Sequence, residues 1–229
     1  MTVAVKNWDR HVADAEEVAR GPGFQRIRDR ILEVAEPESH HTAVDVGAGT
    51  GLLALALAEC VETVWAIDIS PAMGDYLRAK AASAGFLNVE VATSSAVSLP
   101  LVDESADLVV SNYCLHHLDA EGKERALAEI YRVLRPGGRL VFGDMMFQVG
   151  LADPRNRRIV REKARAMLQK GPAGAWRLAK NGFRFATRTW EHPAAAEWWT
   201  KAISRAGFTE VHVEVLDHEG GLAWARRPD

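Results

Sequence analysis

Apolar and polar positions follow two different periods along most of the chain. Short apolar runs, which favour buried strands, are separated by longer stretches with an apolar residue every three or four positions, which favour helices. The predicted strands cover residues 42–46, 64–68, 89–92, 107–111 and 139–143, and the predicted helices between them cover residues 50–60, 71–84 and 120–134. Strands that alternate with helices in this way form a parallel sheet.

The two ends of the chain depart from this alternation. Residues 8–36 predict two helices separated at Gly21-Pro22-Gly23. From 145 to 190 the pattern lapses, and this stretch predicts two helices inserted after the fifth strand. A helix over 193–206 and an antiparallel pair of strands then close the sheet.

The composition is that of a globular domain, with 48% hydrophobic and 26% charged residues in a chain of 229. No apolar run approaches the roughly 20 residues of a membrane span, and the N-terminus lacks the apolar segment of a signal peptide, so we expect a cytoplasmic protein. Cys60 and Cys114 form no metal-ligand spacing, and we expect two reduced thiols and no metal. Arginine outnumbers lysine 21 to 7, a usage typical of GC-rich bacteria.

A glycine-rich loop follows the first predicted strand, in the sequence Val44-Asp45-Val46-Gly47-Ala48-Gly49-Thr50-Gly51. Glycines let the backbone turn sharply and leave room for a ligand. A dinucleotide fingerprint places its third glycine three residues after the second, where this chain has Leu52. Asp68 ends the next strand, where a carboxylate can accept hydrogen bonds from ribose hydroxyls or, alternatively, cap the helix that begins at Pro71.

Further motifs follow the loop in a fixed order. They are Asp68-x-Ser70-x-x-Met73, Leu99-Pro100, Asp107-Leu108-Val109-Val110-Ser111, Leu115-His116-His117 and Glu129-x-x-Arg132-Val133-Leu134-Arg135-Pro136-Gly137-Gly138. Together with the glycine loop, this set resembles the class I S-adenosylmethionine methyltransferases, and within them the ubiquinone/menaquinone C-methyltransferase-like group of small-molecule enzymes. The resemblance implies a three-layer, Rossmann-like α/β fold with a mixed seven-stranded sheet of order 3-2-1-4-5-7-6, in which the last strand is antiparallel.

The same resemblance implies S-adenosylmethionine as the cofactor and a set of residues that bind it. These are Asp45, Gly47, Ala48, Gly49, Gly51, Asp68, Ile69, Met73, Ser95, Ala96, Asn112 and Leu115. The chain departs from the family at Ser95, where an aspartate usually accepts from the adenine amino group. A hydroxyl can still accept that hydrogen bond.

Candidates for the chemistry follow the fourth and fifth strands, and they are Tyr113, His116 and Asp144. His116 is our first choice of base if the acceptor must lose a proton, since histidine titrates near neutrality. The alternative is that the histidine pair only braces this loop, His117 being the more recurrent one in the family. The sequence Asn112-Tyr113-Cys114-Leu115 also lacks the Pro-Pro-aromatic motif of adenine and glutamine N-methyltransferases.

We expect one methyltransferase domain over residues 1–229. Within it, residues 1–40 form a helical lid, 41–145 the cofactor-binding core, 146–190 a helical cap over the acceptor, and 191–229 the helix and hairpin that complete the sheet. The aromatic residues of the cap would line the acceptor pocket or form the core of the cap, and they are Trp176, Phe183 and Phe185.

The predicted cap is strongly basic. Residues 150–189 hold eleven basic and two acidic residues, a net charge of +9 that leaves −12 for the rest of a chain whose total is −3. Three interpretations stay open: a solvated face that pairs with the acidic core, arginines that hold a carboxylate or phosphate of the acceptor, and docking on nucleic acid or an anionic membrane.

The function predicted from these features is methyl transfer from S-adenosylmethionine to an oxygen, nitrogen or carbon atom of a small metabolite, by a monomer or homodimer. An RNA methyltransferase is an alternative, although the acidic total charge and the lack of an RNA-binding module argue against nucleic acid. A protein that binds S-adenosylmethionine without transferring its methyl group is a second alternative, and a dehydrogenase is the last.

Overall fold

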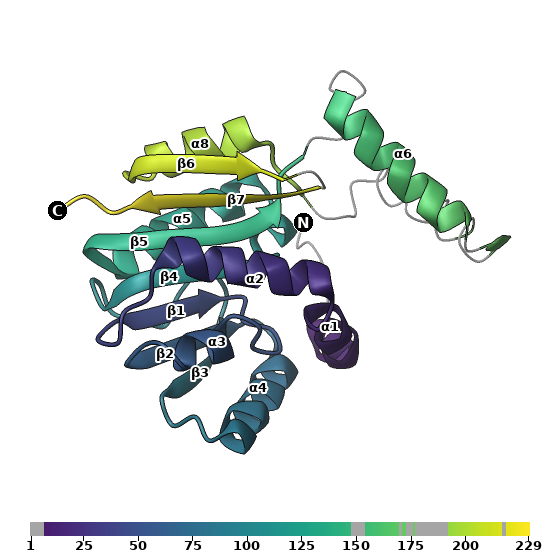
Figure 1. Ribbon diagram of the computed structural model, residues 1–229. Coiled ribbons are helices and arrows are strands. Elements are labelled where there is room, and N and C mark those ends of the chain that lie inside the picture. The colour runs from purple at the N-terminus through teal and green to yellow at the C-terminus, as the bar shows by residue number, and fades with distance from the viewer. Residues whose placement is uncertain (1–6, 148–153, 170, 173–175, 177–191, 217–218) are drawn as a thin grey trace.

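Seven strands form one sheet in the order β3-β2-β1-β4-β5-β7-β6 (Figure 1). The computed structural model describes residues 7–147, 154–169, 171–172, 176, 192–216 and 219–229. The strands are β1 (Thr42–Val46), β2 (Thr63–Asp68), β3 (Val89–Thr93), β4 (Ala106–Asn112), β5 (Leu134–Met145), β6 (Thr209–Val215) and β7 (Gly220–Arg226). Neighbours pair in parallel from β3 to β5, and β7 pairs antiparallel with both β5 and β6. The predicted sheet order is confirmed.

Helices cover both faces of the sheet. The helices among the described residues are η1 (Trp8–His11), α1 (Val12–Ala19), α2 (Pro22–Ala35), α3 (Ala54–Ala58), α4 (Pro71–Ala84), η2 (Leu115–His117), α5 (Ala120–Val133), α6 (Pro154–Leu168) and α8 (Ala196–Arg205). Buried side chains of α2, α3 and α4 pack on one face, and those of α5 and α8 pack on the other. The result is the expected three-layer arrangement, with α6 standing apart from the sheet (Figure 1).

Most element boundaries match the pattern of the sequence. Helix α4 begins at Pro71 because the side chain of Ser70 accepts from the backbone N–H of Met73, and it ends at Gly85, which takes a left-handed conformation with φ 80°. Helix α2 begins after Gly21 with Pro22 in its first turn, at the predicted break.

Other predicted boundaries are wrong, and two of them have a clear physical cause. The helix expected over 50–60 begins only at Ala54, because the residues before it form the turn of the glycine loop. The segment 136–138, which falls between the predicted helix and the fifth predicted strand, lies within β5. Gly137 has φ 75° and donates its N–H to the carbonyl of Arg227 at 2.9 Å, so a pairing with the distant end of the chain extends the strand.

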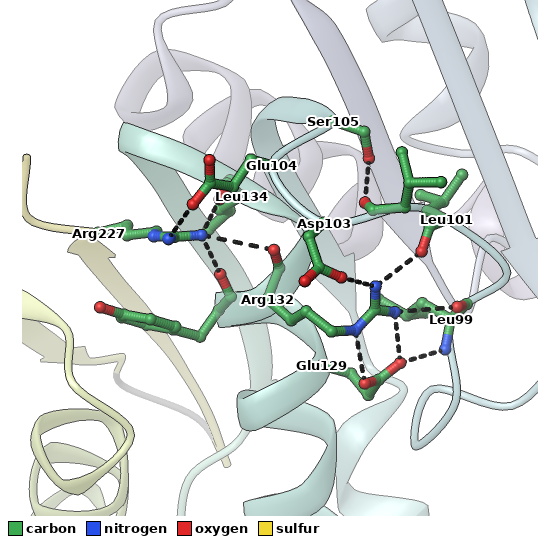
Figure 2. Close-up of polar contacts among 11 residues, drawn as sticks. Leu99, Leu101, Asp103, Glu104, Ser105, Glu129, Arg132, Leu134 and Arg227 are labelled. Atoms are coloured by element: carbon green, nitrogen blue, oxygen red, sulfur yellow. Dashed lines mark hydrogen bonds and ion pairs between the residues drawn. The ribbon is translucent and has the colours of Figure 1, made fainter.

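The pair Glu129 and Arg132 explains one of the sequence motifs. The guanidinium of Arg132 donates to both carboxylate oxygens of Glu129 at 2.9 and 2.8 Å and also to the carbonyls of Leu99 and Leu101 (Figure 2). Glu129 in turn accepts from the backbone N–H of Leu99 at 2.8 Å. The motif at the end of α5 therefore fixes the loop that follows β3.

Arg227 stabilises the C-terminal end of α5. This helix runs directly into β5 without a glycine cap, so its last carbonyls need other donors. Arg227 Nη1 donates to the carbonyls of Tyr131 and Leu134 at 3.1 and 2.5 Å, and Nη2 donates to Glu104 at 2.6 Å (Figure 2). A cation near the negative end of the helix dipole adds to this effect.

Replacing Arg227 with methionine should therefore destabilise the fold, because several carbonyls lose their donor at once. We expect the free energy of unfolding in urea to fall by about 2 kcal/mol. The matched control is Arg205→Met, which removes a single exposed ion pair with Glu124 and should cost less than about 1 kcal/mol. Equal losses in the two variants would contradict the capping role.

Candidate functional site

The glycine loop follows β1 and is hydrogen-bonded to the end of β2. The backbone N–H groups of Gly47 and Ala48 donate to the carbonyl of Ile67 at 2.7 and 3.0 Å, and that of Gly49 donates to the carboxylate of Asp68 at 2.8 Å. Because β1 and β2 are parallel, both ends lie on the same edge of the sheet. The loop is thus held in shape by β2, the strand that ends in Asp68, which is predicted to bind the ribose.

Gly47 and Gly49 are needed for different reasons, although both have positive φ angles, 76° and 51°. A Cβ at Gly47 would lie 2.2 Å from Sγ of Cys114, so the loop packs tightly against the chain that follows β4. A Cβ at Gly49 would meet no atom within 4 Å. The centre of the loop therefore borders open space that a ligand can fill.

Asp68 has a carboxylate that is mostly committed to the backbone. One oxygen accepts from Gly49, and the other accepts from the N–H of Ser70 at 2.9 Å. Burial raises the pKa of Asp68, while these hydrogen bonds act in the opposite direction. Each oxygen keeps a second lone pair, so the group can still accept from two hydroxyls of a ligand.

Asp45 is a buried acid beneath the same loop, only 2% exposed. Its Oδ2 accepts from the N–H of Ala54 at 2.9 Å, at the start of α3. Burial is the main reason why its pKa rises to about 7, and the nearby charge of Asp68 adds to the rise. A cation placed close to this group would favour its charged form.

His116 and Asp144 form a buried pair where the loop after β4 meets the end of β5. One oxygen of Asp144 lies 2.5 Å from Nδ1 of His116, and the other accepts from the backbone N–H of His116 at 2.9 Å. A carboxylate only accepts, so Nδ1 carries the proton and Nε2 of the neutral ring keeps its lone pair. The two hydrogen bonds fix the orientation of the His116 ring.

Tyr113 lies beside this pair in a left-handed conformation with φ 50°. Its N–H donates to the carbonyl of Gly143 at 2.8 Å, and its ring contacts Phe24 at a centroid distance of 4.8 Å. Burial raises the pKa of the Tyr113 hydroxyl, and the charges of Glu219 and Asp144 raise it further. The phenol therefore stays protonated at neutral pH.

The methyltransferase domain family matches residues 44–142. An uncharacterized methyltransferase of Oceanobacillus iheyensis is 33% identical over 120 residues, which are 52% of this chain and 54% of that protein. The chain thus matches about half the length of this curated relative.

Solved structures resemble the chain over nearly its whole length. A SAM-dependent methyltransferase of Aquifex aeolicus has a TM-score of 0.66 and 18% identity, covering 94% of this chain and 98% of that one. A structure of the Haloferax volcanii Trm112 activator in complex with a methyltransferase gives a TM-score of 0.72 and 17% identity, covering 99% and 100%. Residues 44–142 thus match a methyltransferase domain in sequence, and the sheet around them has the fold of these solved structures. The cofactor predicted from the motifs is S-adenosylmethionine, and the Aquifex aeolicus structure is that of an enzyme that depends on it.

The methyltransferase domain has a cradle that fits this cofactor. The open space at Gly49 and the free lone pairs of Asp68 suit an adenosine ribose, and Asp45 suits its positively charged amino acid end. Asn112 at the end of β4 offers a further contact, because its buried Oδ1 has no partner among the described residues. Such an orphaned acceptor is costly without a ligand or water.

The other predicted cofactor residues fall into two groups. Ile69 is 44% exposed beside Asp68, and Ser95 and Ala96 are half-buried in the loop after β3, so all three can meet a ligand. The side chains of Met73 and Leu115 are 3% and 1% exposed and belong to the hydrophobic core. Met73 and Leu115 can therefore contact the cofactor only through backbone atoms, or support its site indirectly by packing behind it.

The N-terminal segment contacts this edge of the sheet and supplies residues that the motifs did not reveal. Asp9 accepts from the hydroxyl of Ser70 at 2.5 Å, next to Asp68. The ring of Trp8 lies 4.6 Å from that of His117. Asp9 is separated from Ser70 by 61 residues, and no local pattern in the sequence marks it.

The buried carboxylate of Glu16 anchors helix α1 in the same region. It accepts from Lys80 on α4 at 2.9 Å and from Arg20 at 3.0 Å, and Lys80 also donates to the carbonyl of Thr50 in the glycine loop. Burial alone would raise the pKa of Glu16, but the hydrogen bonds from Lys80, Thr50 and Arg20 lower it overall. The N-terminal helices are thus tied to the cofactor loop.

A group of possible metal ligands lies apart from this site. Glu38, His40 and His41 bring possible metal-ligand atoms within 4.8 Å of one another, but in the exposed turn before β1, at the opposite edge of the sheet.

Within the described ranges, no helix is long and apolar enough to span a membrane. Of the cap aromatics, Phe183 and Phe185 lie outside the described residues, and Trp176 is 74% exposed.

The pKa of Asp45 predicts how cofactor affinity depends on pH. The cationic ligand favours the charged carboxylate, so binding releases a proton from Asp45 and affinity rises as the pH increases through about 7. For S-adenosylmethionine in a calorimeter, we expect about a tenfold gain between pH 6 and pH 8. Asp45→Asn removes the titrating group and should flatten the profile. The same slope in that variant would assign the effect to another group.

Proposed function

We propose that this protein transfers the methyl group of S-adenosylmethionine to a small molecule whose attacking group must lose a proton, such as a phenolic or enolic hydroxyl. The observation that carries the proposal is the buried pair of His116 and Asp144 at the same sheet edge as the glycine loop. An acceptor that attacked without losing a proton would need no base held in this way.

For this reaction the protein has to hold the cofactor and the acceptor in position and to provide a group that takes up a proton. The cofactor supplies a methyl group on a positively charged sulfur, which a nucleophile displaces in line. Asp144 holds the ring of His116, and Nε2 of His116 takes the proton from the acceptor. Tyr113, which keeps its own proton, can donate a hydrogen bond to the acceptor.

A row of aromatic rings supports a flat acceptor. Ring centroids are separated by 4.6 Å between Trp8 and His117, 3.9 Å between His117 and His116, 6.0 Å between His116 and Tyr113, and 4.8 Å between Tyr113 and Phe24. Planar conjugated groups pack well against such rings. We further propose that residues 1–40 act as the lid and 146–190 as the cap of this pocket.

One observation favours RNA as a second candidate acceptor. Four arginines at helical spacing on α6 are exposed, Arg157, Arg158, Arg161 and Arg165, on a helix that stands apart from the sheet (Figure 1). Their side chains would suit phosphate groups. Methylation of bulk RNA that is lost at raised salt would identify this activity, and methylation of phenols alone would exclude it.

The role of His116 can be tested with His116→Asn, which removes Nε2 while keeping a polar side chain. With a phenolic acceptor found by screening, we expect kcat for S-adenosylhomocysteine formation to fall by about 100-fold or more. Affinity for S-adenosylhomocysteine should stay within about twofold, because the cofactor contacts are separate. An unchanged kcat would remove His116 from the mechanism and leave it as a brace for the loop.

The role of Asp68 can be tested by binding alone. Asp68→Ala removes two acceptors for ribose hydroxyls and also loosens Gly49, so calorimetric affinity for S-adenosylhomocysteine should fall by about 100-fold. Asp75→Ala, an exposed acid on α4 whose carboxylate pairs with Arg78, is the matched control and should bind normally. Binding of NAD in place of S-adenosylhomocysteine would contradict the proposed function.

A further inference from the structure

Lys123 is a buried lysine that the proposed chemistry does not use. It is the fourth residue of α5, and only 2% of its surface is exposed. A buried ammonium needs hydrogen-bond acceptors, since leaving water carries a large cost. The partners of this group therefore indicate what it does.

The ammonium joins two segments that are far apart in the sequence. Nζ donates to the carbonyl of Leu118, at the end of η2, and to the carbonyl of His192 at 2.6 Å. His192 returns a hydrogen bond from its own N–H to the carbonyl of His116, also at 2.6 Å. Residues 116, 118 and 192 are thus held by one connected set of bonds.

The loop that carries His116 needs such outside support. Helix η2 has three residues, and its own bonds are those from His117 to Cys114 and from Leu118 to Leu115. So short a 3-10 turn contributes little stability of its own. The bonds from Lys123 and His192 satisfy the carbonyls of Leu118 and His116, which lie on either side of the second histidine.

We propose that Lys123 is a positioning residue that ties the loop of His116 to the chain leaving the predicted cap. This proposal rests on the proposed function for the role of His116 as base. Residue 192 is the first described residue after the cap region, so one ammonium links the cap's exit to the backbone of the base.

The charge state of Lys123 agrees with this role. Burial lowers its pKa to about 8, while Asp144 and Asp119 favour the charged form and limit the shift. The group is therefore mostly an ammonium at neutral pH, with three donors available for carbonyl groups.

Hydrogen exchange tests the link without any acceptor. Lys123→Met keeps the length and the apolar stem but removes every donor. We expect amide exchange in peptides covering 113–119 and 192–198 to become about tenfold faster or more, with the peptide covering 44–52 unchanged. Lys201→Met on α8, where the lysine is exposed, is the matched control. Unchanged exchange in the two linked peptides would overturn the proposal.

Enzyme kinetics then distinguish a role of Lys123 in positioning His116 from a purely structural role. A misplaced base should lower kcat by about 100-fold in Lys123→Met, with affinity for S-adenosylhomocysteine within about twofold of wild type. If Lys123 acts through His116, the double variant with His116→Asn should be no slower than His116→Asn alone. Additive losses would overturn the positioning role.

Two outcomes keep this proposal distinct from the proposed function. Full activity of His116→Asn would show that His116 is not the base. Faster amide exchange in Lys123→Met would in that case still show that Lys123 links the loop of His116 to residue 192. If Lys123→Met does not fold, His192→Pro removes the N–H donated to His116 and leaves Lys123 intact. That variant should show the same selective loss of kcat, and wild-type kcat would count against the proposal.

Discussion

The hydrogen bonds accepted by Asp68 are the constraint on which the cofactor edge depends. This carboxylate receives the N–H of Gly49 from the loop after β1 and the N–H of Ser70 at the start of α4. Ser70 in turn donates to Asp9 of the N-terminal segment. Asp68 therefore links the loop directly to the start of α4 and, through Ser70, to the N-terminal segment, and the loop is preorganised before any ligand arrives.

Acidic groups are concentrated at this edge, and their burial has an electrostatic cost that the fold itself does not remove. Asp45 and Asp68 lie under and beside the loop with raised pKa values, and Asp144 lies buried next to His116. A cofactor that carries positive charge on its sulfur and amino group offsets this arrangement. The charged form of Asp45, beneath the loop, would repel the pyrophosphate of a dinucleotide, which agrees with the absence of the dinucleotide glycine spacing.

Much of the fold could be predicted from local sequence, and the failures have physical causes. Strand β1 and helix α4 match the predicted ranges because an apolar run and the Ser70-Pro71 start signal decide them locally. The predicted start of the fifth strand, at residue 139, was wrong because Gly137 pairs with Arg227, 90 residues later. Lys123 also escaped notice, although it shares a buried helical stripe with Leu127 and Ile130. Tertiary contacts, which a short stretch of sequence does not contain, determine the start of β5 and the burial of Lys123.

The position of β7 has a consequence for how the chain folds during synthesis. Strand β6 is made before β7, yet its partner in the sheet is β7, which lies between β6 and β5. Until residues 220–226 emerge, β6 has no neighbour and β5 presents an open edge. Unpaired edges of this kind favour pairing with other chains. The nascent protein is therefore most exposed to aggregation just before its last strand is complete.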